Sequence, residues 1–143
     1  MTAATETLKL EVKRVLSAPR ERVFAAWTSA ETLRKFITPG NPGHADVTCD
    51  VRVGGQFTID MHGQDGKVFH HEGEYLVVDS PSRLQFTWIS ASTNQRRTVV
   101  TIDFRPLGEK TEVTLLHEGL ESVQSRDGHE KGWTAILEQQ ERL

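Results

Sequence analysis

The sequence predicts an α+β fold in which a curved antiparallel sheet wraps around one long C-terminal helix. Between residues 44 and 118, short runs of alternating apolar and polar residues are separated by turns, a pattern typical of strands. The segment 127–143 instead places Trp133, Ile136 and Leu137 at i, i+3 and i+4, the spacing of one helical face. No other predicted element is large enough to cover the sheet, so this helix is expected to complete the core.

The C-terminal helix carries signals for its start and its packing. Asp127 and Glu130 have the Asp-x-x-Glu spacing of a capping box, which predicts that the helix begins at Asp127. Gly132 lies at the edge of the apolar face, beside Trp133. Because glycine has no side chain, we expect a neighbouring element to approach the helix closely at Gly132.

The N-terminal part predicts a short tail, a strand and two short helices. Residues 1–7 are small and polar and are expected to be a disordered tail, followed by a single domain over residues 8–143. Residues 8–16 alternate as a strand. Ser17 is the expected N-cap of a first helix, whose apolar face includes Trp27. Ser29 is expected to cap a second helix over residues 31–36.

Six further strands are predicted between the short helices and the final helix. Short turns join them, so an antiparallel meander with one dry face is expected. Gly63 to Gly66 is the predicted hairpin between the second and third of these strands. The inward rows are Phe57, Ile59 and Met61; Gly73, Tyr75 and Val77; Leu84, Phe86 and Trp88; Val100, Ile102 and Phe104; and Val113, Leu115 and His117.

Composition excludes several classes of function. The net charge of −3 argues against non-specific binding to nucleic acid, which requires a basic surface. No segment is apolar enough for a membrane span, and the N-terminus lacks a signal-peptide core, so a cytoplasmic protein is expected. The single Cys49 excludes an internal disulfide and is more typical of a small buried residue than of a nucleophile. No metal site or cofactor is predicted, because no His or Cys cluster has ligand spacing.

The motifs together resemble a known family. They are the segments 23–33, 50–57, 65–66, 73–75, 82–88 and 111–120 and the pair Gly132-Trp133. In these the chain is similar to the branch of the SRPBCC superfamily related to the C-terminal domain of the activator of Hsp90 ATPase. The resemblance implies the helix-grip fold of Bet v 1, START domains and polyketide cyclases. One departure is Phe36, which stands where the family often carries a tryptophan, and a reshaped pocket is expected there.

The resemblance also implies a cavity between the sheet and the last helix that binds apolar small molecules. We expect this cavity to be lined by the large inward residues, although each can equally serve as ordinary core packing. The candidates are Trp27, Phe36, Phe57, Met61, His71, Tyr75, Phe86, Trp88, Phe104, His117 and Trp133.

Three hypotheses of function follow, from different classes. The first is the binding or sensing of a small apolar, aromatic or lipid-like molecule. The second is a cyclase-like or hydrolytic enzyme that uses His117, Tyr75 or His71 as acid or base, although a buried histidine is more often a satisfied structural residue. The third, suggested by the family name, is partnership with an Hsp90-type chaperone. A monomer or a homodimer paired through an edge strand is compatible with the sequence.

Overall fold

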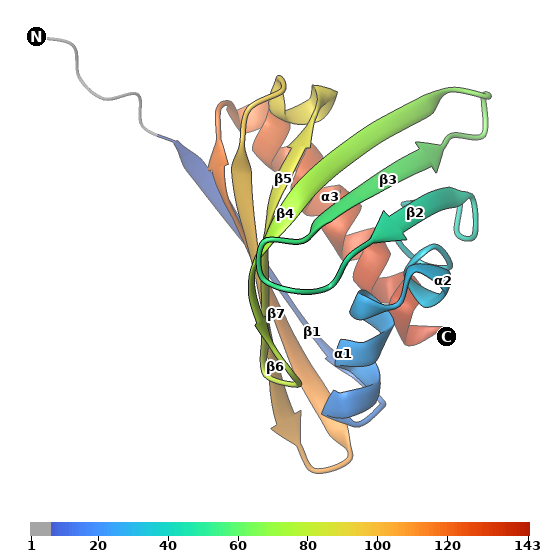
Figure 1. Ribbon diagram of the computed structural model, residues 1–143, viewed down its shortest axis with the longest axis vertical. Helices are drawn as coiled ribbons and strands as arrows, with labels where there is room; N and C mark the ends of the chain where they lie inside the picture. The colour runs from blue at the N-terminus through green and yellow to red at the C-terminus, as the bar shows by residue number, and fades with distance from the viewer. Residues whose placement is uncertain (1–6) are drawn as a thin grey trace, which may run out of the picture.

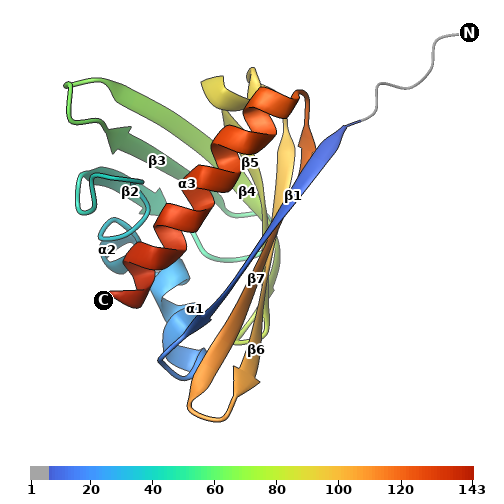
Figure 2. The same cartoon turned by 180° about the vertical axis from the view of Figure 1, so that it is seen from behind.

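The computed structural model describes residues 7–143 as one antiparallel sheet of seven strands with α3 across its concave face (Figures 1 and 2). The first six residues, and with them most of the expected tail, lie outside the described residues. Strand order is β1-β7-β6-β5-β4-β3-β2. The strands are β1 (Leu8–Leu16), β2 (Ala45–Cys49), β3 (Gln56–His62), β4 (Val68–Asp79), β5 (Arg83–Ser90), β6 (Thr98–Leu107) and β7 (Lys110–Leu120). The helices are α1 (Arg20–Thr28), α2 (Ala30–Leu33), the short 3-10 helix η1 (Ala91–Thr93) and α3 (Val123–Glu141).

This architecture confirms the predicted fold class and element order. β2 to β7 form a meander, and β1 returns to pair with β7. The predicted hairpin between β3 and β4 is present, with Gly66 at a φ of 84° that favours glycine. The connection between β5 and β6 contains η1, which Ser90 caps through its side chain.

The inward rows follow the predicted alternation except in β4. Tyr75 is buried, but the register with β5 shifts between Tyr75 and Val77. As a result Val78, rather than the predicted Val77, packs against the core. An irregularity of this kind inserts an extra residue and reverses the facing of the side chains beyond it.

α3 begins earlier than the sequence predicted. Its N-cap is Ser122, whose Oγ accepts a hydrogen bond from the backbone N–H of Ser125 at 3.1 Å. Asp127 and Glu130 therefore lie inside the helix, and the predicted capping box is wrong. The error has a physical cause: no residue between Val123 and Gly132 is buried, so the first turns of the helix carry no apolar periodicity.

The starts of the two short helices also differ in detail from the prediction. Pro19, not Ser17, is the N-cap of α1, and no side chain caps this helix. The residue before a proline is restricted to extended backbone, which moves the start of the helix past Ala18. Ser29 does cap α2, its Oγ accepting from the N–H of Thr32 at 3.3 Å. α2 ends at Leu33, and residues 34–36 continue as turns rather than as helix.

The close approach expected at Gly132 is found elsewhere. A Cβ built at Gly132 would lie 3.7 Å from Cγ of Pro39, an ordinary contact distance. At Gly73 in β4, by contrast, a Cβ would overlap the carbonyl oxygen of Thr87 and the ring of Phe57. A position at which only glycine fits therefore lies in the sheet and not at Gly132 of the helix.

None of the helices in residues 7–143 has the length and apolar character that crossing a membrane would require.

Candidate functional site

The predicted site residues fall into two regions that differ in packing. Between the sheet and the pair α1 and α2, the aromatic side chains fill the interior and leave a void of only about 10 Å³. Phe57 lies 5.4 Å from Tyr75 and 5.3 Å from Phe86, measured between ring centroids. These distances are typical of packed aromatic pairs. In this region the predicted residues form core, and those lining the void are Trp27, Phe57, Tyr75, Phe86 and Trp88.

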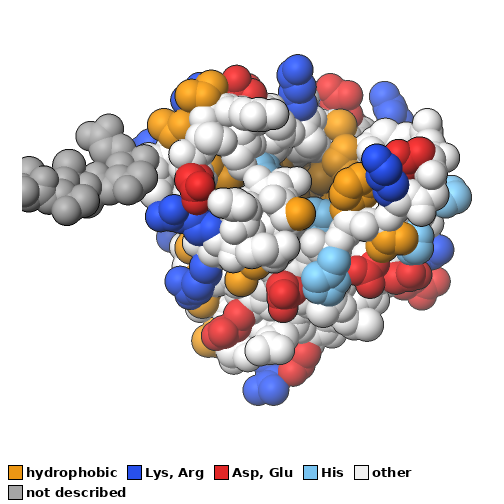
Figure 3. Space-filling view, turned by 90° about the horizontal axis from the view of Figure 1, so that it is seen from above, with side chains coloured by type: hydrophobic (Ala, Val, Ile, Leu, Met, Phe, Trp, Pro, Cys, Tyr) orange, Lys and Arg blue, Asp and Glu red, His pale blue; other side chains and the backbone are white. Residues whose placement is uncertain are grey.

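A cleft opens at the other end of the sheet, beneath the N-terminal half of α3. This α3 cleft has a volume of about 200 Å³ and lies between α3, η1 and the strands β3, β4 and β5. Figure 3 shows this end of the molecule, where hydrophobic and histidine side chains lie in a hollow. The cleft is lined by Pro39, Met61, Phe69, His71, Trp88, Ser92, Gly128, His129, Gly132, Trp133 and Ile136.

The structure thus brings four of the predicted residues together at the α3 cleft: Met61, His71, Trp88 and Trp133. Phe36, Phe104 and His117 line neither the cleft nor the void. Phe36 packs edge-on against Trp27 at 5.2 Å, and Phe104 packs edge-on against Phe24 at 5.2 Å. Of the three residues expected for acid–base chemistry, only His71 reaches the cleft.

The floor of the cleft is a cluster of tilted rings centred on Trp88. Its ring centroid lies 4.8 Å from that of His71 and 4.9 Å from that of Trp133. Trp88 is 3% exposed, and its buried indole Nε1 has no hydrogen-bond partner within residues 7–143. A buried indole N–H normally has a partner, and Trp88 is an exception.

His117 lies behind the floor and is fully engaged by the protein. Its Nδ1 accepts from the indole N–H of Trp133 at 3.0 Å. Its Nε2 lies 2.7 Å from Oγ1 of Thr98, and that hydroxyl donates onward to the carbonyl of Trp88 at 2.5 Å. Nε2 must therefore carry the proton of a neutral ring. Burial and the neighbouring His129 lower the pKa of His117 to about 3, so the side chain is a structural connector at neutral pH.

Two histidines line the α3 cleft itself. Nδ1 of His71 donates to the carbonyl of Phe69 at 3.0 Å, and Nδ1 of His129 donates to the carbonyl of Ser125 at 2.7 Å. Burial lowers the pKa of His71 to about 4, although nearby backbone carbonyls oppose the shift. Burial also lowers the pKa of His129. Both rings are therefore neutral at pH 7.

Tyr75 and Cys49 are removed from the cleft and poorly suited to proton transfer. Burial is the main cause that raises the pKa of the Tyr75 phenol, and the neighbouring Cys49 adds to it. Burial likewise raises the pKa of the Cys49 thiol. Tyr75 lines only the small void. Both groups therefore remain protonated at neutral pH, in keeping with a packing role.

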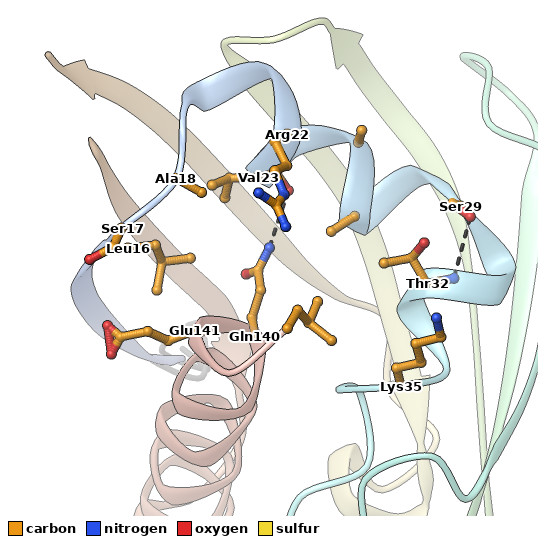
Figure 4. Close-up of a pocket in the computed structure, with 13 residues that line it drawn as sticks. Leu16, Ser17, Ala18, Arg22, Val23, Ser29, Thr32, Lys35, Gln140 and Glu141 are labelled. Atoms are coloured by element: carbon orange, nitrogen blue, oxygen red, sulfur yellow. Dashed lines mark hydrogen bonds between the residues drawn. The ribbon is translucent and has the colours of Figure 1, made fainter. Parts of the chain in front are cut away.

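A second depression, the α1 groove, lies outside the sheet–helix interior. It runs between α1, α2 and the end of α3 and has a volume of about 490 Å³ (Figure 4). Charged side chains stand at its edges, among them Arg22, Lys35 and Glu141. Arg14 pairs with Glu141 at 2.6 Å. Its larger volume reflects a gap between helices at the surface, with no aromatic floor.

Seven of the eleven residues that line the cleft were not among the predicted site residues, and the bulkier of these include Pro39, Phe69 and His129. Of these three, only His129 left a usable signal, because it lies four residues before Trp133 and therefore on the same face of a helix. Pro39 belongs to a loop, and Phe69 lies at an outward-facing end of β4, 49% exposed. Within the described residues, no three His, Cys, Asp or Glu side chains are grouped in a way that could hold a metal ion.

Comparison with known proteins agrees with this architecture. Residues 17–143 match the family described as Activator of Hsp90 ATPase homolog 1-like protein. Protein CV1439 from Chromobacterium violaceum has a TM-score of 0.82 and 24% identity, covering 94% of each chain. Protein NE0264 from Nitrosomonas europaea has a TM-score of 0.79 and 26% identity, covering 94% of this chain and 92% of that one. CalU16 from Micromonospora echinospora has a TM-score of 0.70 and 21% identity, covering 92% and 72%. No curated protein sequence matches the chain. The chain has the helix-grip fold.

Proposed function

The chain belongs to the Activator of Hsp90 ATPase homolog 1-like family, and we propose that it binds a small uncharged aromatic molecule in the α3 cleft. The observation that carries this proposal is the cleft itself, which places an apolar, ring-lined hollow between the sheet and α3. Ligand sites of proteins are mostly apolar concavities with a few polar groups, and this cleft has that composition.

The size of the cleft limits the ligand. Its volume of about 200 Å³ is below the roughly 300–1,000 Å³ usual for drug-sized ligands. It exceeds the roughly 150 Å³ of an engineered apolar cavity that binds benzene. A molecule with one ring, or two fused rings, therefore fits.

The charge of the lining limits the ligand further. Within residues 7–143, none of the side chains lining the cleft belongs to Lys, Arg, Asp or Glu. His71 and His129 are neutral at pH 7 because burial lowers the pKa of each. A charged ligand would lose its hydration without gaining an opposite charge, which is costly. The cleft therefore favours uncharged molecules.

The test is a thermal-shift titration with single-ring and fused-ring aromatic compounds on three proteins. Gly132→Leu should fill the cleft, whereas Ala25→Leu should fill the α1 groove and serves as the matched control. Ligands that bind the folded state raise Tm. We expect Tm to rise for the wild type and Ala25→Leu but not for Gly132→Leu. Loss of binding in Ala25→Leu alone, or no shift with any compound, would contradict the proposal.

The enzymatic hypothesis now rests on His71 alone among the three predicted residues. A neutral histidine in a cleft can accept a proton, but one with a pKa of about 4 is a weak base at pH 7. Partnership with an Hsp90-type chaperone stays a prediction from the family name.

A further inference from the structure

The free edge of β1 carries a pattern of charges that is complementary to itself. Within residues 7–143, β1 is an outer strand of the sheet and pairs only with β7. One side of such an edge strand offers unpaired backbone N–H and C=O groups to another strand. We propose that this edge binds a second copy of the chain as an antiparallel strand, which gives a homodimer with Val12 opposite Val12. The dimer does not require a ligand in the α3 cleft.

The side chains of β1 alternate between the two faces of the sheet. Leu10 and Val12 are buried in the core, whereas the residues between and beside them are exposed: Lys9, Glu11, Lys13 and Val15. Nζ of Lys13 lies 3.8 Å from Oε1 of Glu11, and both side chains are more than half exposed. The face of β1 that points away from the core therefore carries a positive, a negative and a positive charge in order.

Two-fold symmetry restricts how two β1 strands can pair. A two-fold axis between antiparallel neighbours is perpendicular to the sheet, so opposite residues face the same side and one residue lies opposite its own copy. When that residue is Val12, the pairing includes all nine residues of the strand. Glu11 then lies opposite Lys13 of the second copy, and Lys13 lies opposite Glu11 of the second copy. The four charges alternate in sign both along and across the two strands.

Other registers are less favourable. When Glu11 or Lys13 lies opposite its own copy, like charges meet at the centre, and like charges opposite each other destabilise a strand pair. When Leu10 lies opposite its own copy, Lys9 meets Glu11, but only residues 8–12 of the strand are paired. A parallel pair related by a two-fold axis places every charge opposite its own copy. The register centred on Val12 therefore combines the longest pairing with matched charges.

The concave side of the sheet is compatible with this register. Arg14 would lie opposite Leu10 of the second copy, and an inward-facing charge can protect an edge strand from pairing. Here the guanidinium of Arg14 is bound to Glu141 of α3 at 2.6 Å, so its charge is compensated within its own chain. The register shift between β1 and β7 lies at Leu8 and Lys9, at one end of the strand, and leaves the central charge pairs in regular strand.

The opposite edge of the sheet lacks this complementarity. β2 has five residues, and its exposed Asp46 and Thr48 would lie opposite each other if Val47 paired with its own copy. Asp46 already pairs with Nε2 of His62 at 2.8 Å within the chain. β1 is therefore the edge that fits a second copy, and β2 provides a matched control.

Sedimentation equilibrium from about 10 µM to about 1 mM protein tests the dimer and its register. The mass of the wild type should rise toward twice that of one chain. Glu11→Lys and Lys13→Glu each place like charges opposite each other at both central pairs and should raise the dimer Kd about tenfold or more. The double variant Glu11→Lys/Lys13→Glu exchanges the two charges and should dimerise again. An equal mixture of the two single variants should form a heterodimer, and Asp46→Lys should keep the wild-type Kd.

Each result supports or overturns one part of the proposal. A wild-type protein that stays monomeric over this range overturns the dimer. A Kd that is the same in the wild type and both single variants overturns the assignment to β1, and a loss of dimerisation in Asp46→Lys assigns the interface to β2. If both single variants are weakened but the double variant does not recover, the register centred on Val12 is refuted. All the substituted side chains are exposed, and an unchanged urea midpoint checks that each variant remains folded.

Discussion

The two halves of α3 cover the same sheet but are held to the molecule in different ways (Figure 2). From Trp133 to Gln140, the helix buries five side chains, three of them apolar and two of them glutamines. From Val123 to Gly132 it buries none. The α3 cleft lies under the N-terminal half at Gly128, His129 and Gly132, and it extends to Trp133 and Ile136 at the start of the buried half. One helix therefore closes the core at one end and covers the α3 cleft at the other.

Two consecutive glutamines fasten the C-terminal half. Gln139 donates to the carbonyls of Phe36 and Thr38 at 2.8 and 3.0 Å, and its Oε1 accepts from the N–H of Gly40 at 3.0 Å. Gln140 accepts from the indole of Trp27 at 2.9 Å and donates to the carbonyl of Val23 at 3.2 Å. The amides thus connect α3 to α1 and to the loop after α2, and Figure 4 shows Gln140 reaching Val23.

The N-terminal half has few such connections. Ser125 donates through Oγ to the carbonyl of Ser92 at 2.7 Å, at the edge of the cleft. The other contacts of this half are mostly within the helix, such as the bond from His129 to Ser125. The hydrogen bonds that fasten α3 therefore lie at its C-terminal end, away from the residues that line the cleft. Substitutions that remove the glutamine contacts should leave affinity for a cleft ligand largely unchanged.

Acidification should produce the largest loss of stability. It should act mainly through the two buried histidines, His117 behind the floor of the α3 cleft and His71 in that floor. His117 and His71 stay neutral in the folded protein, with pKa values of about 3 and about 4, but take up a proton near pH 6.5 when unfolded. Between about pH 6.5 and pH 4 the unfolded state therefore binds more protons, and stability falls as pH falls. From pH 7 to pH 5 each histidine should cost at most about 2 kcal/mol, so the two together should cost at most about 4 kcal/mol.

Urea denaturation at pH 7 and pH 5 measures this effect. His117→Gln and His71→Gln should each reduce the difference in unfolding free energy between the two pH values. His129→Gln is the control on the exposed half of α3 and should change the difference less, because His129 is half-buried. An equal effect from all three variants would contradict the assignment of the pH dependence to the two fully buried histidines.

Loss of a glutamine should give the next largest effect. Gln140→Ala leaves the indole N–H of Trp27 buried without a partner, and an unsatisfied buried group costs roughly 1–3 kcal/mol. The carbonyl of Val23 loses one of its bonds but keeps its partner within α1. We expect the free energy of unfolding to fall by about 2 kcal/mol. Gln124→Ala, at the exposed end of the same helix, should stay within about 0.5 kcal/mol of the wild type.

Chemical denaturation at pH 7 compares these two alanine variants. Similar losses at Gln124 and Gln140 would show that the two ends of α3 are held equally. Affinity for a cleft ligand should be unchanged in both variants while they remain folded, because neither glutamine lines the α3 cleft.

The sequence predicts the frame of the molecule better than the site. Alternation in the strands and the spacing of Trp133, Ile136 and Leu137 follow from burial, which leaves a direct trace in the sequence. The cleft lies largely under the N-terminal half of α3, whose residues show no periodic spacing of apolar side chains. Its extent could therefore not be predicted from the sequence. The glutamine fastening is similarly hidden, since Gln139 and Gln140 look like the exposed end of an amphipathic helix.

The position of His117 shows a second limit of prediction from the sequence. Its inward position could be predicted from Val113 and Leu115, but its partners Trp133 and Thr98 come from other elements. The sequence gives the facing of a residue, whereas its hydrogen bonds depend on how the elements meet. For this reason Trp88 and Trp133, which are adjacent in space, differ in their partners although both were predicted only as cavity aromatics.

The smallest expected effect concerns the two glycines in the loose half of α3. Gly128 has open space where a Cβ would stand, and Gly132 has Pro39 at an ordinary contact distance of 3.7 Å. Alanine should therefore fit at both positions. Because glycine is less favourable than alanine in a helix interior, each substitution should stabilise the protein by about 0.5–1 kcal/mol.

Both glycines also line the α3 cleft, so the same methyl groups should reduce the space for a ligand. Gly128→Ala and Gly132→Ala should raise the urea midpoint and weaken the binding of an aromatic probe, with opposite signs for stability and affinity. Gly73→Ala, at the one crowded position in the sheet, serves as the contrast and should be strongly destabilising. If Gly132→Ala destabilised the protein, α3 would have to pack closer to Pro39 than the structure shows. The N-terminal half of α3 would then be part of the core.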